Sequence, residues 1–329
     1  MSNIASISNE LRSLLDFQGD FDQLAVLMEQ SWSENHAQSL LYTQPFLESC
    51  FQYPGSTFAL APTIYHGSTP VGFVAGFPRS VRYMGSDRKI LIITFLTVAP
   101  EFKKAGYGIV LWSELVKRAQ ALGFDGMMNY CVEGEAMNGM ILGCCHRMRL
   151  PVEHIFSVSY LSSILWPRAV SATATETAFD PIDALLDEAA PIADRTPLAR
   201  QWTPQEARWQ CTRPDAVLAH YECESRRGLL TGSIMELTDA NHTRTLLVED
   251  VLWGSLQAEE RVRLVKLLVA KATAQGARMA TVPVQGYADM EPFRAARFRP
   301  STRVLHAYFT LWNGPSSLER VPSFYLDVF

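Results

Sequence analysis

The chain has 329 residues, of which 48% are hydrophobic and 19% charged, and its formal net charge is −5. This length suits two domains with sizeable cores, and the acidic balance without a Lys/Arg-rich run excludes general nucleic-acid binding. No apolar stretch is long enough to span a membrane and no secretory signal pattern is present, so we expect a cytoplasmic protein without membrane contact. Six cysteines without Cys-x-x-Cys pairs predict neither a metal site nor a disulfide framework.

The first half of the chain predicts helices and strands in alternation. Helices are indicated where apolar residues recur every three or four positions, and strands where apolar and β-branched residues form short runs. The predicted elements are helices over 21–32 and 44–51, strands over 58–65, 71–77 and 90–98, a helix over 107–122, a short strand over 127–132, a helix over 135–148 and strands within 152–165.

The segment that joins the strand at 90–98 to the helix at 107–122 is the most informative. Pro100 ends the strand, two lysines follow, and Gly106 and Gly108 open the helix. Glycines allow backbone N–H groups to point toward one place, and a helix N-terminus carries partial positive charge, so this turn predicts a phosphate site. A Rossmann fingerprint is excluded because a third glycine would fall at Leu111, and a Walker loop lacks its Gly-Lys-Ser/Thr.

The same loop resembles the pyrophosphate-binding motif of the GNAT superfamily of acyl-CoA-dependent N-acyltransferases, with Lys103 where that family commonly has Arg or Gln. The order of elements over 20–166 is similar to that of the GNAT fold. The resemblance implies an α/β fold with a twisted mixed sheet flanked by helices, and an acyl-CoA, expected to be acetyl-CoA, as cosubstrate. The residues that it assigns to cofactor binding are Leu96, Thr97, Val98, Lys103, Lys104, Ala105, Gly106, Tyr107, Gly108, Ile109 and Asn138.

The catalytic residues are predicted from the next helix and the strand before it. In the GNAT family this helix often reads Asn-x-x-Ala-x-x-Leu-Tyr, with the tyrosine as candidate proton donor; here Asn138 matches and Cys145 stands at the tyrosine position. Three interpretations of Cys145 stay open: a proton donor to the leaving thiolate, an acylated nucleophile, or an inert small residue. Glu133, at the end of the preceding strand, is the candidate general base for the attacking amine.

The second half repeats the pattern of the first after a segment of different composition. Small polar residues, prolines and acids over 168–203 predict a linker with one short helical turn around 182–189. Beyond it we expect paired strands over 217–223 and 229–237, a strand over 244–253, a helix over 259–275 and a short strand. We therefore predict two tandem GNAT-like domains: a catalytic acyl-CoA-binding domain over 1–167, the linker over 168–203 and a degenerate domain over 204–329.

The loop before the second long helix differs from its counterpart in charge. Glu259 and Glu260 open this helix and would repel a pyrophosphate, so one cofactor site per chain is expected. The predicted function is transfer of an acetyl group from acetyl-CoA to an amine of a small molecule. A noncatalytic acyl-CoA-binding or scaffold protein is the alternative, and transfer to a protein N-terminus or lysine is a third possibility. The chain is expected to be a monomer or a homodimer.

Overall fold

The computed structural model describes residues 12–32, 40–132, 136–166, 180–223, 225–238, 242–312 and 318–327. The elements of the first half are β1 (Arg12–Asp16), α1 (Phe21–Trp32), α2 (Gln44–Phe51), η1 (Phe58–Leu60), β2 (Pro62–His66), β3 (Thr69–Tyr83), β4 (Ser86–Val98), η2 (Pro100–Ala105), α3 (Tyr107–Ala121), β5 (Gly126–Val132), α4 (Ala136–Arg147) and β6 (Glu153–Ile164). Those of the second half are α5 (Pro181–Arg195), β7 (Leu198–Arg200), α6 (Pro204–Thr212), β8 (Ala216–Cys223), β9 (Arg226–Glu236), β10 (Arg244–Leu252), α7 (Ala258–Ala274), β11 (Met279–Val284), α8 (Glu291–Ala295), β12 (Arg299–Leu311) and β13 (Phe324–Tyr325).

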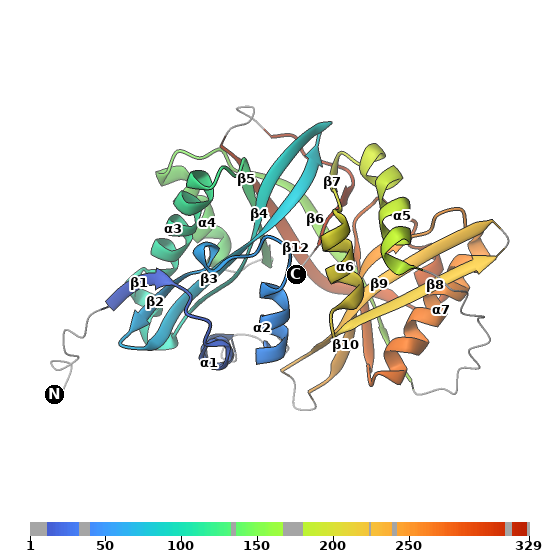
Figure 1. The fold of residues 1–329 in the computed structure, drawn as a ribbon, viewed down its shortest axis with the longest axis horizontal. Coiled ribbons are helices and arrows are strands. Elements are labelled where there is room, and N and C mark those ends of the chain that lie inside the picture. The colour runs from blue at the N-terminus through green and yellow to red at the C-terminus, as the bar shows by residue number, and fades with distance from the viewer. Residues whose placement is uncertain are drawn as a thin grey trace.

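The described strands form one large mixed sheet that runs through both halves (Figure 1). Its order is β1-β2-β3-β4-β5-β12-β6-β11-β10-β9-β8, so β12 of the second half pairs with β5, and β6 of the first half pairs with β11. Each half thus contributes its last long strand to the sheet of the other half. The mixed α/β fold is confirmed, whereas the place at which the chain divides into folding units stays a prediction.

The two halves repeat one arrangement around their longest helices. In the first half, α3 connects β4 to the parallel strand β5; in the second half, α7 connects β10 to the parallel strand β11. Gly123 and Gly276 end these two helices with φ values of +76° and +91°, a left-handed conformation that glycine adopts without steric cost. The structure therefore shows the duplication that the sequence pattern predicts.

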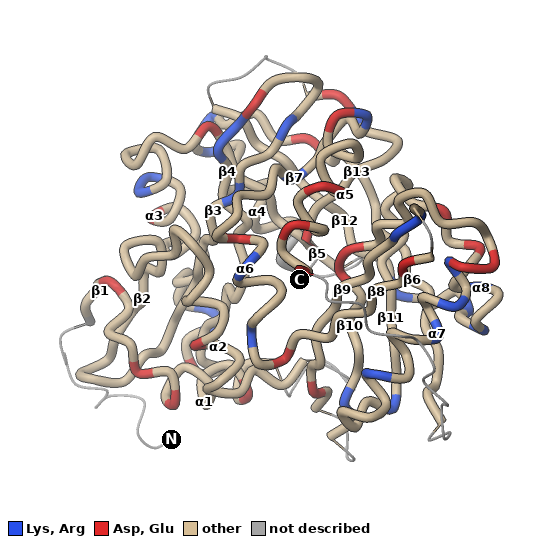
Figure 2. Tube along the Cα trace, turned by 45° about the vertical axis from the view of Figure 1, so that its right-hand side comes forward, with Lys and Arg blue, Asp and Glu red and all other residues tan. Residues whose placement is uncertain are grey.

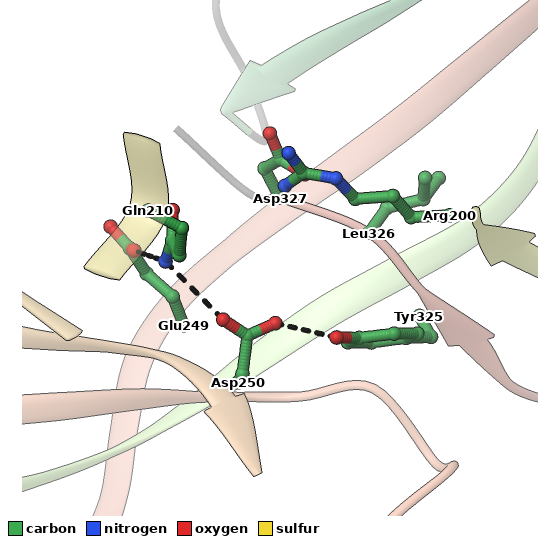
Figure 3. A pocket seen from close by; sticks show the side chains of 7 residues that line it. All are labelled: Arg200, Gln210, Glu249, Asp250, Tyr325, Leu326 and Asp327. Carbon is green, nitrogen blue, oxygen red and sulfur yellow. Dashed lines mark hydrogen bonds and ion pairs between the residues drawn. The ribbon is translucent and has the colours of Figure 1, made fainter. Parts of the chain in front are cut away.

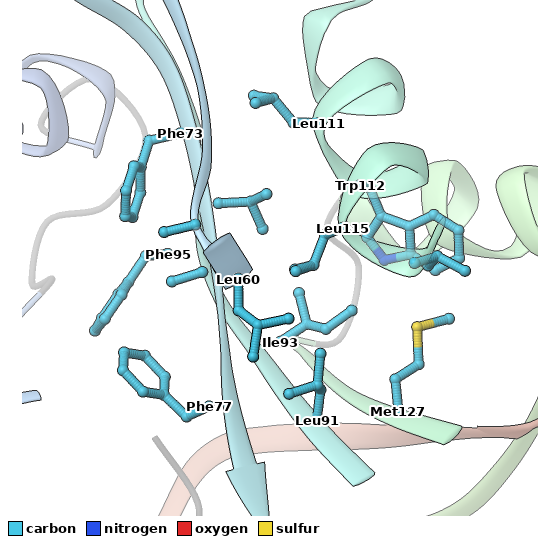
Figure 4. Close-up of a cluster of buried hydrophobic side chains, with 14 of the residues drawn as sticks. Leu60, Phe73, Phe77, Leu91, Ile93, Phe95, Leu111, Trp112, Leu115 and Met127 are labelled. Atoms are coloured by element: carbon cyan, nitrogen blue, oxygen red, sulfur yellow. The ribbon is translucent and has the colours of Figure 1, made fainter. Parts of the chain in front are cut away.

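The core of the first half lies on both faces of β3 and β4. Leu111, Trp112 and Leu115 of α3 pack on one face, and Phe73 and Phe77 lie on the other (Figure 4). In a regular strand, residues two positions apart point to the same face. Figure 4 instead shows Phe95 on the side of Phe73 and Phe77, across the strand from Ile93. A bulge in β4 causes this change of face, as its register with β3 shifts there and Phe95 has a φ of +60°.

The predicted linker is more ordered than its composition indicates. In place of one helical turn, α5 extends over 15 residues from Pro181, and β7 pairs with the end of β3. The sequence analysis took the prolines as helix breakers. Pro181 instead stands at the first helical position, where no N–H is needed, and the Asp180 side chain caps the helix by accepting from the Ile182 N–H at 2.8 Å.

Strand β12 is absent from the sequence prediction. Its first residues are polar and exposed, and only its second half, from Leu305 to Leu311, carries an apolar run. The end of the chain packs against the rest of the protein: the Phe324 ring stacks on Phe156 at a centroid distance of 3.6 Å.

Candidate functional site

The turn between β4 and α3 has the geometry of an anion site. Gly106 caps α3 with a φ of +78°, and a Cβ built on it would meet no atom within 4 Å. No side chain caps the first turn of α3, and no acidic residue lies in that turn. The start of α3, with its partial positive charge, therefore has free space next to Gly106, and a helix start of this kind can bind a phosphate group.

The lysines of this turn lie on the protein surface. Lys103 and Lys104 end the η2 helix and are exposed. The Lys103 ammonium lies 3.5 Å from the main-chain oxygen of Ser31 at the end of α1. The other predicted cofactor residues of the turn are adjacent in the chain: Ala105 precedes the cap, and Tyr107, Gly108 and Ile109 form the first turn of α3. The structure thus brings the predicted loop residues together around one helix N-terminus.

The strands beside this turn diverge. β4 and β5 pair in parallel from Ile90–Gly126 to Ile93–Asn129, and no pair follows beyond that point in these two strands. The bulge at Phe95 comes directly after the last pair. Leu96, Thr97 and Val98 therefore follow the divergence, where main-chain groups on the β5 side have no sheet partner in β5.

The end of α1 closes part of this opening. The Ser31 hydroxyl donates to the main-chain oxygen of Val98 at 2.9 Å, and the Trp32 indole N–H donates to the Thr97 hydroxyl at 3.3 Å. Lys103 and the end of β4 therefore both contact the last turn of α1. An extended molecule that lies along β4 would pass between this turn and the start of α3.

The second half has the same strand geometry but no comparable opening. β10 and β11 stop pairing after Leu247–Thr281, and β10 shifts register between Val248 and Asp250. The Val251 N–H, on the diverging part of β10, donates to the Tyr287 hydroxyl at 2.9 Å. The protein itself therefore satisfies a main-chain group beyond the bulge.

The chain end fills the rest of this second opening. The Tyr325 hydroxyl donates to the Asp250 carboxylate at 2.7 Å (Figure 3). The Leu326 N–H donates to the side chain of Gln285, which follows β11, at 3.0 Å. The remaining space beside Asp250 is large enough for about one water molecule. A cofactor arm has no room there.

The start of α7 is occupied as well. Glu260 accepts from the Gln257 N–H at 2.8 Å in a capping box and pairs with Arg226 at 2.9 Å. A carboxylate of the chain thus takes the place that a phosphate would need at this N-terminus. The contrast between α3 and α7 supports the prediction of a single cofactor site in the first half.

The predicted catalytic residues fall in and near α4. Glu133 lies outside the described residues. Asn138 stands in the first turn of α4, and its side chain is not among those described. Cys145 is fully buried, with its sulfur 4.0 Å from the Thr310 hydroxyl of β12. Burial raises the pKa of this thiol to about 11, which favours the inert interpretation over the proton donor and the nucleophile.

Replacement of Cys145 by alanine tests these interpretations. We expect acyl transfer by the Cys145→Ala protein to stay within about twofold of the wild-type rate, because a buried thiol with a raised pKa supplies little thiolate. Steady-state release of free CoA measures the rate. A loss of tenfold or more with unchanged acyl-CoA binding would show that the thiol takes part in the reaction.

A network of buried charges that the sequence analysis missed joins the two halves. Asp327, near the chain end, accepts from Arg79 of β3 at 2.6 Å and from Arg200 of β7 at 2.6 Å. Burial opposes its charge, but Arg200 and Arg79 hold the pKa of this carboxyl at about 2. Figure 2 shows that Lys and Arg positions and Asp and Glu positions are distributed along both halves of the chain. Because its members are scattered along the chain, no local spacing in the sequence indicates the network.

A second carboxyl of this region, Asp250, has a different character. It accepts from Gln210 and Tyr325 (Figure 3) and from Thr231, and it has no ion pair of its own among the described residues. Burial raises its pKa to about 6, and the hydrogen bonds from Thr231 and Tyr325 limit this rise. Its contacts are all within the protein, so we assign it to the packing of the second half.

Membrane-spanning helices and metal-binding clusters are both absent from the described residues. No helix among them is long and apolar enough to cross a membrane. No group of three or more histidine, cysteine, aspartate or glutamate residues in the described ranges has the arrangement of a metal site.

Comparison with known proteins identifies the fold. Residues 21–138 match the model of the acetyltransferase (GNAT) family. No curated protein sequence matches the chain. Among solved structures, the chain is similar to Saccharomyces cerevisiae N-myristoyltransferase with bound myristoyl-CoA, with a TM-score of 0.73 and 12% identity over 98% of this chain and 86% of that chain. A putative acetyltransferase from Pyrococcus horikoshii has a TM-score of 0.54 and 11% identity over 99% and 98% of the two chains. A GCN5-related N-acetyltransferase from Anabaena variabilis has a TM-score of 0.52 and 13% identity over 91% and 72%.

Proposed function

Because residues 21–138 match the model of the acetyltransferase (GNAT) family, we propose that this chain is an N-acyltransferase that moves an acetyl group from acetyl-CoA to an amine of a small molecule. The observation that carries the proposal is the uncapped start of α3 at Gly106, beside the diverging end of β4. The pyrophosphate would bind at this helix start, and the pantetheine arm would lie along Leu96, Thr97 and Val98.

The packing beside the bulge supports a small acyl group. The Phe95 ring lies 5.4 Å from the Tyr42 ring and 5.9 Å from the Phe77 ring, in edge-to-face contacts. Aromatic rings at these distances fill the space between them. A short acyl chain fits next to such a wall more easily than a long one, although the N-myristoyltransferase with the same fold binds myristoyl-CoA.

The chemistry requires few groups. The neutral amine attacks the thioester carbon, a C–N bond forms, the C–S bond breaks, and the proton from the nitrogen ends on the sulfur or in solvent. Direct attack needs no covalent enzyme intermediate, which agrees with a buried Cys145. Glu133 stays the proposed general base.

The test is turnover with a panel of donors and acceptors. Purified protein is mixed with acetyl-, octanoyl- or myristoyl-CoA and with small amines or a peptide that has a free N-terminus. Release of free thiol and the mass of the acylated product are then measured. The proposal predicts the fastest transfer with acetyl-CoA and a small amine. Faster transfer with myristoyl-CoA or to the peptide would correct the donor or acceptor, and tight binding without transfer would favour the noncatalytic alternative.

A further inference from the structure

One buried hydroxyl next to the predicted cofactor path has no hydrogen-bond partner. Tyr130 lies on β5 and is the first residue after Asn129, which forms the last pair with β4. Its hydroxyl oxygen is inaccessible to solvent and is not bonded to any group among the described residues. A buried polar group of this kind lowers stability, so its retention calls for a reason.

The fold satisfies comparable tyrosines elsewhere. The Tyr53 hydroxyl bonds to Glu206, the Tyr83 hydroxyl bonds to the main chain of Glu319, and the Tyr325 hydroxyl bonds to Asp250. Tyr130 differs from these three residues because it stands at the divergence of β4 and β5. The main chain of Tyr130 therefore lies next to the point where the two strands separate, beside the proposed path of the ligand.

The Tyr130 side chain points to the face of the sheet opposite to α3. Asn129 faces α3, because its side-chain oxygen accepts from the Trp112 indole N–H at 3.0 Å. Tyr130, the next residue of the strand, points to the opposite face and packs near Phe156, with ring centroids 6.3 Å apart. This is the face to which the bulge turns Phe95 (Figure 4).

We propose that the Tyr130 hydroxyl donates a hydrogen bond to the carbonyl oxygen of the acyl thioester and stabilises the negative charge that develops there. This inference rests on the proposed function. As the amine nitrogen bonds to the carbonyl carbon, an electron pair moves to the oxygen; when the C=O bond re-forms, the C–S bond breaks and the pair leaves with sulfur. Tyr130 keeps its proton throughout.

The electrostatic surroundings suit a donor that does not ionise. Burial, with the nearby Asp327 carboxylate and the Tyr160 hydroxyl, raises the pKa of Tyr130 well above its usual value of 10, and Arg79 opposes this rise. The hydroxyl therefore stays protonated at neutral pH and is available for hydrogen bonding to an oxyanion.

The experiment compares Tyr130→Phe with the wild type in transfer and in binding. Loss of one preorganised donor to an oxyanion reduces kcat by roughly 100-fold, whereas KM for acetyl-CoA should change little.

Calorimetry with the nonreactive ketone analogue of acetyl-CoA, in which CH2 replaces the thioester sulfur, supplies a second readout. Its affinity should fall in the variant, while that of CoA should not. Without ligand, the Tm of the variant should be equal to or above that of wild type, because the variant lacks an unpaired buried hydroxyl.

Tyr83→Phe is the matched control. It removes a tyrosine hydroxyl that bonds to Glu319 within the protein, so it should lower Tm and leave kcat unchanged. An unchanged kcat and unchanged affinity for the ketone analogue in Tyr130→Phe would overturn the inference, as would a lower Tm with normal kcat. If the wild type binds neither CoA nor the analogue, the proposed function itself fails. If it binds both without turnover, the two affinities still decide the role of Tyr130.

Discussion

Replacement of Gly106 by valine is expected to weaken acyl-CoA binding by roughly 100-fold or more. Two effects cause this loss. Valine is strained at a φ of +78°, and its side chain enters the open space at the start of α3. Each charge-assisted hydrogen bond that a phosphate loses there is worth about 1.5–3 kcal/mol. The loss of two such bonds therefore weakens acyl-CoA binding by roughly 100-fold or more. Isothermal calorimetry with acetyl-CoA measures the change.

The opposite end of the same helix supplies the control. Gly123 has a φ of +76° and, like Gly106, would place a Cβ in open space, but it lies at the C-terminus of α3. Gly123→Val should therefore lower stability about as much as Gly106→Val does. Its acyl-CoA affinity should stay within about twofold of the wild-type value, since no phosphate would bind at a helix C-terminus. Equal losses of affinity in both variants would show that the effect of Gly106→Val is a general disturbance of the fold.

Replacement of Asp327 by asparagine is expected to destabilise the protein by about 3–5 kcal/mol, because it leaves the buried guanidinium groups of Arg79 and Arg200 without their shared counter-charge. Chemical denaturation at pH 7 measures the change. Asp194→Asn is the matched control: Asp194 pairs with Arg82 at 2.6 Å on the surface, and such an exposed, solvent-screened pair contributes little to stability. Similar losses in the two variants would contradict a special role for the buried network.

The Asp327 carboxyl should also make the stability of the protein depend on pH. Its folded pKa of about 2 lies below the ordinary value of 3.8, so its contribution to stability is present above pH 4 and is lost as the pH falls through 2. The lost contribution is about 2 kcal/mol. We expect the wild type to lose this stability between pH 4 and pH 2, and Asp327→Asn to lose correspondingly less over the same range.

Local patterns in the sequence predict the elements that build the cofactor turn. The helix over Phe21–Trp32 has the predicted bounds, and α3 begins at Tyr107 as expected, because amphipathic spacing and glycine caps are properties of short segments. The contrast between the two helix starts is also visible in the sequence, since Glu259 and Glu260 lie in the first turn of α7, whereas the first turn of α3 has no acidic residue.

Long-range pairing is not predictable in this way. The exchange of β6 and β12 between the halves depends on which strand edges pair. The residue pattern within one strand does not predict which other strand pairs with it. The ion pairs of Asp327 join residues more than 100 positions apart. In the sequence Tyr130 has the pattern of an ordinary strand residue, and only the structure shows that its buried hydroxyl has no hydrogen-bond partner among the described residues.

The stoichiometry of acyl-CoA binding tests the central claim most directly. The claim is that the first copy binds the cofactor at Gly106, and that the second copy is closed by Glu260 and by the chain end at Tyr325. Calorimetric titration of the full chain with acetyl-CoA should give one site per chain, which Gly106→Val removes. Two sites per chain, or one site that persists in Gly106→Val, would contradict it.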